Sequence, residues 1–409
     1  MKRSSILIVG LNYAPEPVGI GLYTQGLAEA LVADGRRVSV VCGQPYYPQW
    51  RLYPGFAQGY GTTRENGVTV LRCPHYIPAQ PSGIRRVVHL ASFALGALPQ
   101  ALRASLGKDR PDTVIAIAPA LLSAVTAWIA ARLAGAKLWI HVQDFEAEAA
   151  IATGLIGSNG LAARLALAVE RAILGRADTV STISPQMVRR LIDKGIPADM
   201  TIELRNWAYE RFTPDSEGAR NLREEWGLGP RTVALYSGNI ARKQGIEVLV
   251  DTARLLQHRS DIVFVICGEG PNRTALEQRA AGLANVQIRD LQPAERMGAL
   301  LAMADLHLLP QIGGAADLVL PSKLTNMLAS GRPVVATTEP GTGLYAEVEG
   351  CGIATPPENT AALAKAVVEL ADDPKRRAQL GEVGARHAAE RWSKPAIIAR
   401  WTAALDRQG

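Results

Sequence analysis

The sequence predicts an α/β fold with two Rossmann-like halves, because one strand–loop–helix–strand plan occurs twice along its 409 residues. The loop of the first plan contains Gly19 and Gly21, which would let the backbone approach a ligand closely. At this length, with 48% hydrophobic residues, the chain has room for two cores. The expected elements are a strand at 6–9, a helix at 23–34 and a strand at 37–42, then a strand at 232–237, a helix at 246–259 and a strand at 262–267.

Residues 320–335, LPSKLTNMLASGRPVV, predict a loop, a short helix and a buried strand. Pro321 presets the first helical turn, Ser322 offers an N-cap oxygen, and Gly331 permits the left-handed conformation at the helix end. Lys323 in the first turn makes the helix start a seat for a phosphate-bearing ligand, since helix dipole and lysine both attract anions. An ordinary strand–helix unit is the alternative.

Residues 114–131 carry no charge over eighteen positions, which reaches the lower limit of a membrane-spanning helix. Pro119 divides this stretch into a strand-like VIAIA and a helix-like segment, and a further strand is expected at 137–142. We therefore expect a buried strand and a helix here.

One boundary divides the chain. The segment at 211–219, RFTPDSEGA, concentrates Pro, Ser, Gly and charge and is typical of a linker. The predicted domains are a first at 1–207, a second at 220–391, and a C-terminal helix at 392–409.

Composition limits the classes of protein to consider. The four cysteines, Cys42, Cys73, Cys267 and Cys351, have neither metal-ligand nor disulfide-framework spacing, which favours a reducing cytoplasm. We expect no signal peptide, no metal site and no cofactor. The net charge of +6 suits an anionic partner, but no aromatic–basic module predicts nucleic acid.

An apolar helix with basic flanks, VVHLASFALGALPQAL, offers a different anionic partner. Arg85 and Arg86 precede it, and Arg103, Lys108 and Arg110 lie at its far end. This pattern suits the surface of an anionic membrane. A core helix with solvated ends fits the pattern equally well.

Four motifs together resemble the retaining glycosyltransferases of family four, which have the GT-B fold. They are YAPEPVGIG at 13–21, PYYPQW at 45–50, HVQDFE at 141–146 and PSKLTNMLASGRPVV at 321–335, and they are most similar to the branch of colanic-acid-biosynthesis fucosyltransferases. The resemblance implies two domains facing each other across a cleft, with the C-terminal helix packing on the first. It also implies transfer of a sugar from a GDP- or UDP-sugar to a polyprenyl-diphosphate-linked saccharide, at the cytoplasmic face of the plasma membrane, without metal.

The resemblance assigns Lys243 to the donor diphosphate, because it matches the lysine of the family's KG motif in GNIARKQG; a solvated loop lysine is the alternative. The family's arginine is replaced by Asn239, so Arg242 or Lys323 would supply the missing charge. The family's second glutamate is replaced by Asn326, for which we expect a hydrogen bond to ribose. The expected donor residues are Gly19, Gly21, Gly238, Asn239, Arg242, Lys243, Gly268, Glu269, Leu291, Pro321, Ser322, Lys323, Leu324 and Asn326.

Catalysis is assigned to Asp144 together with Lys243. Asp144 follows the family's usual histidine position, which is Gln143 here, and it would orient or deprotonate the acceptor hydroxyl. A helix-capping role is the alternative for Asp144. The expected acceptor contacts are Glu146 and the loop aromatics Tyr13, Tyr46, Tyr47 and Trp50, for each of which half-buried packing is the alternative.

Two other functions stay open on the sequence. A nucleotide-sugar epimerase of the same fold would release free sugar products from the donor alone. A membrane-associated scaffold of polysaccharide assembly would not bind nucleotide at all.

Overall fold

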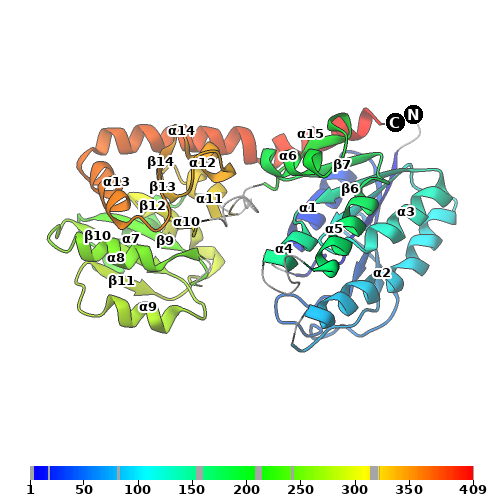
Figure 1. Ribbon diagram of the computed structural model, residues 1–409, viewed down its shortest axis with the longest axis horizontal. Coiled ribbons are helices and arrows are strands. Elements are labelled where there is room, and N and C mark those ends of the chain that lie inside the picture. Colours follow the sequence, from blue (N-terminus) through cyan, green and yellow to red (C-terminus); the bar gives the residue numbers. More distant parts are fainter. Residues whose placement is uncertain are drawn as a thin grey trace. The chain divides into compact units, whose positions relative to one another are not determined.

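The computed structural model describes residues 4–16, 19–80, 83–152, 160–207, 214–240, 244–313, 321 and 323–408. The chain divides into two compact units (Figure 1). Unit 1 comprises residues 1–206 and 397–409, and unit 2 comprises residues 207–396.

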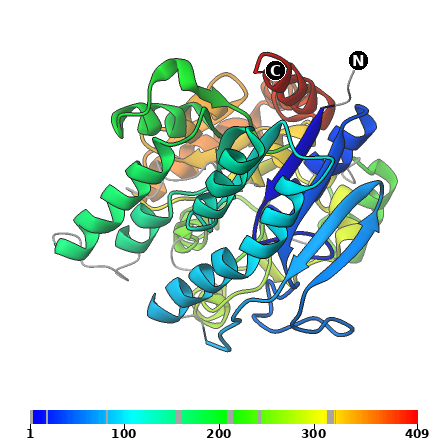
Figure 2. The ribbon, with the colours of Figure 1, turned by 90° about the vertical axis from the view of Figure 1, so that its right-hand side faces the viewer.

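Unit 1 is built on an eight-stranded sheet of order β3-β4-β2-β1-β5-β6-β7-β8 (Figure 2). All neighbouring strands are parallel except β3 and β4, which form an antiparallel pair at one edge. The strands are β1 (Ser5–Val9), β2 (Arg37–Gly43), β3 (Gly61–Glu65), β4 (Val68–Cys73), β5 (Thr113–Ala118), β6 (Lys137–Val142), β7 (Thr179–Thr182) and β8 (Thr201–Glu203).

Helices cover both faces of this sheet. Alternate residues of β6 point to opposite faces: Leu138 and Ile140 join the core under α2 and α3, whereas Trp139 stacks on Trp401 of α15, with ring centroids 5.2 Å apart. The C-terminal helix therefore completes the core of unit 1. The helices are α1 (Ile20–Ala33), α2 (Gly83–Leu106), α3 (Ser123–Ala134), α4 (Glu146–Ala152), α5 (Leu161–Leu174), α6 (Pro185–Asp193) and α15 (Lys394–Asp406).

Unit 2 has a six-stranded parallel sheet of order β11-β10-β9-β12-β13-β14. Its strands are β9 (Thr232–Ser237), β10 (Ile262–Cys267), β11 (Val286–Arg289), β12 (Leu306–Leu309), β13 (Val334–Thr337) and β14 (Gly352–Thr355). Its helices are α7 (Ser216–Glu225), α8 (Glu247–Leu255), α9 (Arg273–Ala280), α10 (Met297–Ala302), α11 (Lys323–Ala329), α12 (Gly343–Val348), α13 (Thr360–Asp372) and α14 (Pro374–Trp392).

Both sheets have the Rossmann order, in which the first strand of each half lies at the centre and the chain then continues on its other side. In such sheets ligands bind beyond the carboxyl ends of the strands, at the point where the order reverses. This point lies between β1 and β5 in unit 1 and between β9 and β12 in unit 2. The loops after these strands are where functional residues are to be sought.

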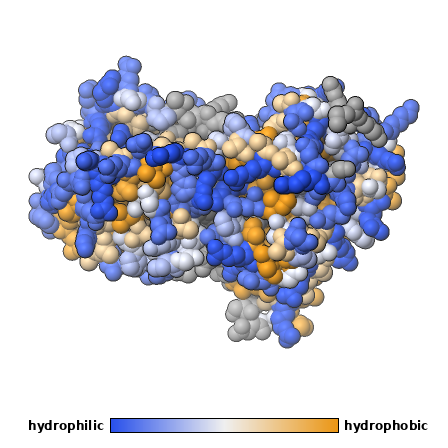
Figure 3. Space-filling model, turned by 90° about the horizontal axis from the view of Figure 1, so that it is seen from above, coloured by the Kyte–Doolittle hydropathy of each residue, from blue (hydrophilic) through white to orange (hydrophobic). Residues whose placement is uncertain are grey.

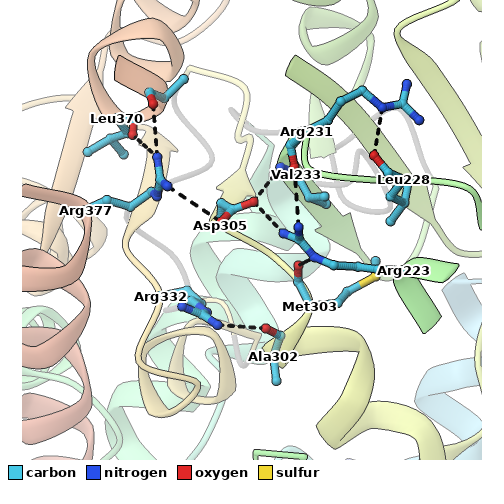
Figure 4. A network of polar contacts seen from close by, with 11 residues as sticks. Arg223, Leu228, Arg231, Val233, Ala302, Met303, Asp305, Arg332, Leu370 and Arg377 are labelled. Carbon is cyan, nitrogen blue, oxygen red and sulfur yellow. Dashed lines mark hydrogen bonds and ion pairs between the residues drawn. The ribbon is translucent and has the colours of Figure 1, made fainter. Parts of the chain in front are cut away.

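The opposite edge of unit 2 is held by a polar network around Asp305, which directly precedes β12 (Figure 4). Asp305 Oδ2 accepts from the amide of Val233 at 2.8 Å and from Arg223 at 2.5 Å, and Arg377 lies 3.8 Å from Oδ1. Arg377 also donates to the Leu370 carbonyl. These contacts tie the amino ends of β9 and β12 to α7 and α13, so this edge stabilises the unit and leaves the carboxyl edge for function.

The structure confirms most of the expected elements and corrects the bounds of several. The helix expected at 23–34 is α1, which already begins at Ile20, so Gly21 lies in its first turn and not in the loop before it. Residues 114–131 comprise all but the first residue of β5 and most of α3, and no described helix is long and apolar enough to cross a membrane. The predicted linker is too long at its C-terminal side, because α7 already begins at Ser216, where the Asp215 carboxylate caps the Gly218 amide at 2.8 Å. The predicted helix at 246–259 is also shorter, because α8 ends at Leu255.

Candidate functional site

Two glycines bring the loops after β9 and β10 of unit 2 into direct contact. A Cβ atom on Gly268 would lie 1.8 Å from the carbonyl oxygen of Gly238, and Gly238 itself has a φ of 144°. The Ile240 amide donates to the Glu269 carbonyl at 2.8 Å, so the two loops run together as one backbone surface. Only glycine fits both positions, and the result is a backbone-lined carboxyl edge beside β12.

Lys323 lies over this glycine surface. A Cβ atom on Gly238 would meet the Lys323 Cε and Nζ atoms at 2.3 Å. Lys323 Nζ donates to the Tyr236 hydroxyl at 2.9 Å, and that hydroxyl donates to the Asn239 carbonyl at 2.6 Å. Tyr236 is buried, and burial raises the pKa of its hydroxyl, so it stays protonated and holds the ammonium group in place. The arrangement fixes one cation on a backbone surface, as an anionic ligand requires.

Two more predicted donor residues, Glu269 and Leu291, follow the ends of β10 and β11. Glu269 forms an ion pair with Arg273, which also donates to the Gly268 carbonyl at 3.1 Å and to Asp290 at 2.6 Å. Leu291 follows Asp290 and is exposed. The Glu269 carboxylate is thus held by the protein, while Leu291 offers an apolar surface next to it.

The remaining predicted donor residues divide into two groups. Asn326 lies on α11 with its side chain half-buried, Leu324 of the same helix is fully buried in the core, and Pro321 precedes the helix. Leu324 therefore packs in the core. Because it is fully buried, the prediction that Leu324 contacts the ligand is wrong. Ser322, Arg242 and Lys243 lie outside the described residues, as do Asp317 and Leu318 at the family's first glutamate position.

In unit 1, a buried carboxylate that sequence reasoning missed joins two loops. Glu16 Oε1 accepts from the amides of Tyr46 and Tyr47 at 2.9 and 3.0 Å, and Oε2 accepts from Asn12 Nδ2 at 2.8 Å. Gly21 packs on this side chain, because a Cβ there would lie 3.4 Å from Glu16 Oε2. Glu16 therefore joins the first turn of α1 to the loop that carries Tyr46 and Tyr47, the aromatic loop. The sequence signal that could have indicated this role is the position of Glu16 between two prolines (PEP, 15–17), just before the two glycines.

Four rings gather where β2 and β4 end, next to the start of α2. The Tyr46 ring lies 5.3 Å from those of Trp50 and His75 and 4.8 Å from that of His89. His89 Nδ1 donates to the Tyr76 carbonyl, so in the neutral ring Nε2 accepts from the Tyr46 hydroxyl at 3.0 Å. Trp50 adopts a φ of 53°, uncommon for an aromatic residue. The four rings pack on one another, and the two histidines were not predicted.

Burial corrects part of the acceptor prediction. Tyr13 and Tyr46 are both buried, so the expectation that they lie exposed on loops is wrong. Trp50 is half-buried and Tyr47 is exposed, with its ring 3.8 Å from the Cβ position of Gly19. Tyr47 and Trp50 therefore remain the candidates for contact with a sugar, and Tyr46 positions them.

Asp144 lies two residues after the end of β6 and is half-buried at the carboxyl edge of unit 1. Burial raises the pKa of its carboxyl group, whereas a hydrogen bond from the Phe145 amide and the charge of Arg86 act in the opposite direction. The charge of Arg86 acts in the same way on Glu146 and Tyr46. Arg86 of α2 is therefore close to the loops after β2 and β6, a position that the sequence did not predict.

Glu146 is occupied by the backbone. Its two oxygens accept from the amides of Ala120 and Leu121 at 2.8 and 2.7 Å, and the residue is half-buried. Ala120 has a φ of 81°, so this carboxylate holds the loop after β5 in a conformation that alanine seldom adopts. The prediction of an acceptor contact at Glu146 is therefore replaced by a positioning role.

His141 of the HVQDFE motif faces away from the site. It packs on Trp401 with ring centroids 5.1 Å apart, and Nδ1 is bonded to the Ser181 hydroxyl at 2.8 Å. Complete burial lowers its pKa to about 3, so it is a neutral core residue. Among the described residues, no group of three or more His, Cys, Asp or Glu could hold a metal ion.

Two family models match the chain in sequence. Residues 18–207 match the glycosyl transferase 4-like domain, and residues 231–373 match the glycosyl transferases group 1. The protein named "Putative colanic acid biosynthesis glycosyl transferase WcaI" of Escherichia coli K12 is 39% identical over 93% of this chain and 95% of its own length. The α-D-kanosaminyltransferase of Streptomyces kanamyceticus is 33% identical over 48% of this chain and 52% of its own.

Comparison with solved structures identifies the fold. Sucrose-phosphate synthase from Thermosynechococcus elongatus matches 99% of both chains with a TM-score of 0.71 at 20% identity. HepE from Anabaena, solved with UDP-glucose, matches 98% of this chain and 99% of its own with a TM-score of 0.67 at 17% identity. The two parallel-sheet units are thus those of a GT-B glycosyltransferase. The chain belongs to family four of the glycosyltransferases, and it is an enzyme of that class.

Proposed function

We propose that the chain transfers a sugar, with retention of anomeric configuration, from a UDP- or GDP-sugar to a polyprenyl-diphosphate-linked saccharide during exopolysaccharide synthesis. The observation that carries the proposal is Lys323, held by the Tyr236 hydroxyl over the glycine surface at the carboxyl edge of unit 2. The name of the 39% identical relative assigns it to colanic acid biosynthesis, which supports the acceptor class. The UDP-glucose complex of HepE supports the donor class.

Unit 2 would bind the donor. Breaking the sugar–phosphate bond leaves negative charge on the diphosphate, and a fixed ammonium group on a surface free of side chains stabilises that charge. The contacts of Lys323 with the Tyr236 hydroxyl and with Gly238 support this role for Lys323, and the KG motif supports it for Lys243. Two lysines would neutralise the leaving group directly, so the proposed reaction needs no metal.

Unit 1 would bind the acceptor. Tyr47 and Trp50 offer ring faces for a sugar, and Asp144 lies at the carboxyl edge to orient the attacking hydroxyl or accept its proton. In the retaining reaction proposed here, attack and departure occur on one face of the sugar. The donor phosphate then helps to remove the proton, and no protein nucleophile is assigned.

Thermal unfolding in the presence of UDP, GDP and their sugars tests the donor. A ligand at a hundred times its Kd should add about 2.7 kcal/mol of stability. Absence of any nucleotide effect would favour the scaffold, and release of free sugar without an acceptor would favour the epimerase.

Lys243→Ala should lower turnover about 10²- to 10³-fold if this lysine stabilises the leaving group. Steady-state kinetics on the correctly folded variant give the answer. Unchanged kinetics would remove Lys243 from the site.

A further inference from the structure

Two helices of unit 1, α2 and α5, each expose apolar side chains along one of their faces. On α2 the exposed fractions are 81% for Ile84, 57% for Val87 and 72% for Leu95; on α5 they are 82% for Leu161 and 62% for Leu165. Val88 and Val169 extend the two rows. The residues on α5 are four apart and so form one stripe. Exposed apolar side chains grouped in this way mark an interaction surface.

The charge on these helices has one sign. All exposed ionisable side chains of α2 and α5 are arginines, with Arg85 and Arg86 on α2 and Arg164 and Arg171 on α5. The single acidic residue, Glu170, is buried and accepts from Lys194 at 2.6 Å. Apolar stripes with purely cationic flanks complement an anionic lipid surface. They would repel a second copy of the same face.

Both helices begin at the functional edge of the sheet. In parallel α/β sheets a crossover helix runs antiparallel to the strands, so it starts near their carboxyl ends. The helix α2 lies in the crossover from β4 to β5, and α5 lies in the crossover from β6 to β7. Both crossovers run in the same direction across the sheet. Figure 2 shows their N-terminal ends projecting toward the same side of unit 1. Ile84, Leu161 and Leu165 are therefore at the edge that carries Asp144. Figure 3 shows, on another face, apolar patches set among hydrophilic residues.

We propose that α2 and α5 together form a docking surface for an anionic bilayer, which inserts Ile84, Leu161 and Leu165 and contacts Arg85 and Arg164. The inference rests on the proposed function in one respect: a bilayer at this edge would present a lipid-linked sugar to Asp144 without its leaving the membrane. The sequence pointed only to α2. The stripe on α5 is a property of the folded chain.

Co-sedimentation of the full chain with vesicles tests the surface. We expect binding to equal parts phosphatidylglycerol and phosphatidylcholine, and weaker binding in high salt. Leu165→Glu should weaken it about tenfold or more. Leu255→Glu is the matched control, because Leu255 is 52% exposed on α8 of unit 2. This variant should bind vesicles as the wild-type protein does. Arg85→Glu with Arg164→Glu should reduce binding to anionic vesicles only.

Three results would overturn the proposal: no binding of wild-type protein to anionic vesicles, equal losses for Leu165→Glu and Leu255→Glu, or a Leu165→Glu effect on oligomeric state without one on vesicles. Nucleotide binding by thermal shift is measured on every variant. If it is intact when vesicle binding fails, the docking surface is wrong and the proposed transfer stands. If nucleotide fails to bind, the proposed transfer is wrong whatever the vesicles show.

Discussion

The carboxyl edges of the two sheets share one strand order and differ in chemistry. In unit 2 the edge is backbone with a fixed cation: Gly238 and Gly268 touch, and Lys323 lies across them. In unit 1 the edge is built from rings and buried titratable groups, among them Glu16, His89 and Asp144. The comparison teaches that the same fold can carry two chemically different edges. In the proposed function the edge of unit 2 would bind the charged part of the donor, and the edge of unit 1 would contact the sugar and handle the proton. The proposal therefore expects the pH dependence of the reaction to arise in unit 1.

The strongest test of this division is Asp144→Asn. Loss of a group that accepts or orients a proton lowers kcat about 10²- to 10⁴-fold, with donor affinity unchanged. Single-turnover kinetics at saturating donor measure it. Asp193→Asn is the control, because Asp193 is an exposed carboxylate at the end of α6. Normal kcat with Asp144→Asn would reduce Asp144 to a capping residue.

On the side of unit 2, Lys323→Ala should weaken donor binding. A hydrogen bond to a charged group contributes about 1.5–3 kcal/mol, which corresponds to about 10- to 150-fold in donor affinity. Tyr236→Phe removes only the hydroxyl that holds Lys323 and should cost less. Calorimetric titration with the nucleoside diphosphate measures both. If Tyr236→Phe costs more than Lys323→Ala, the hydroxyl itself binds ligand and the assignment changes.

Glu16→Gln tests how the aromatic loop is positioned. The new amide group would face donors that the carboxylate now accepts from, so we expect the free energy of unfolding to fall by about 1–3 kcal/mol. We also expect acceptor KM to rise while donor affinity is retained. Denaturant unfolding and kinetics give both quantities. A change in donor affinity alone would show that Glu16 instead positions Gly21 and the start of α1.

Asn326→Ala should raise donor KM about 2- to 12-fold and leave kcat unchanged, since a neutral hydrogen bond contributes about 0.5–1.5 kcal/mol. Asn326→Glu should be tolerated at the start of α11. Kinetics at saturating acceptor measure both variants. A fall in kcat with unchanged donor KM would show that the amide acts in the transition state.

The smallest expected effect compares two adjacent arginines. The charge of Arg86 lowers the pKa of Asp144 against the effect of burial, so Arg86→Gln should raise that pKa. Asp144 would then be protonated at a higher pH, and kcat would fall earlier as the pH decreases. Arg85→Gln, which removes the same charge one residue away, should leave this limb of the profile in place. Equal shifts for both variants would indicate general surface charge.

Local sequence was sufficient for much of the fold. Strands at 232–237 and 262–267 match β9 and β10 to the residue, because apolar runs with glycine at their ends leave few alternatives. Pro119 correctly divided the uncharged stretch into strand and helix. The linker was misjudged at Asp215 and Ser216, because residues typical of loops are also those that cap a helix.

For the sites, the sequence by itself determined which residues follow the strands, since carboxyl ends of parallel strands meet at one edge whatever the packing. Among these residues, the family resemblance then selected Gly238, Gly268 and Asp144 as site candidates. Only the tertiary structure decided which side chains are used there. Glu146 is taken up by the amides of Ala120 and Leu121, and Glu16 by those of Tyr46 and Tyr47. The physical reason is that a buried carboxylate must find its hydrogen-bond donors wherever the fold brings them, often far away in sequence.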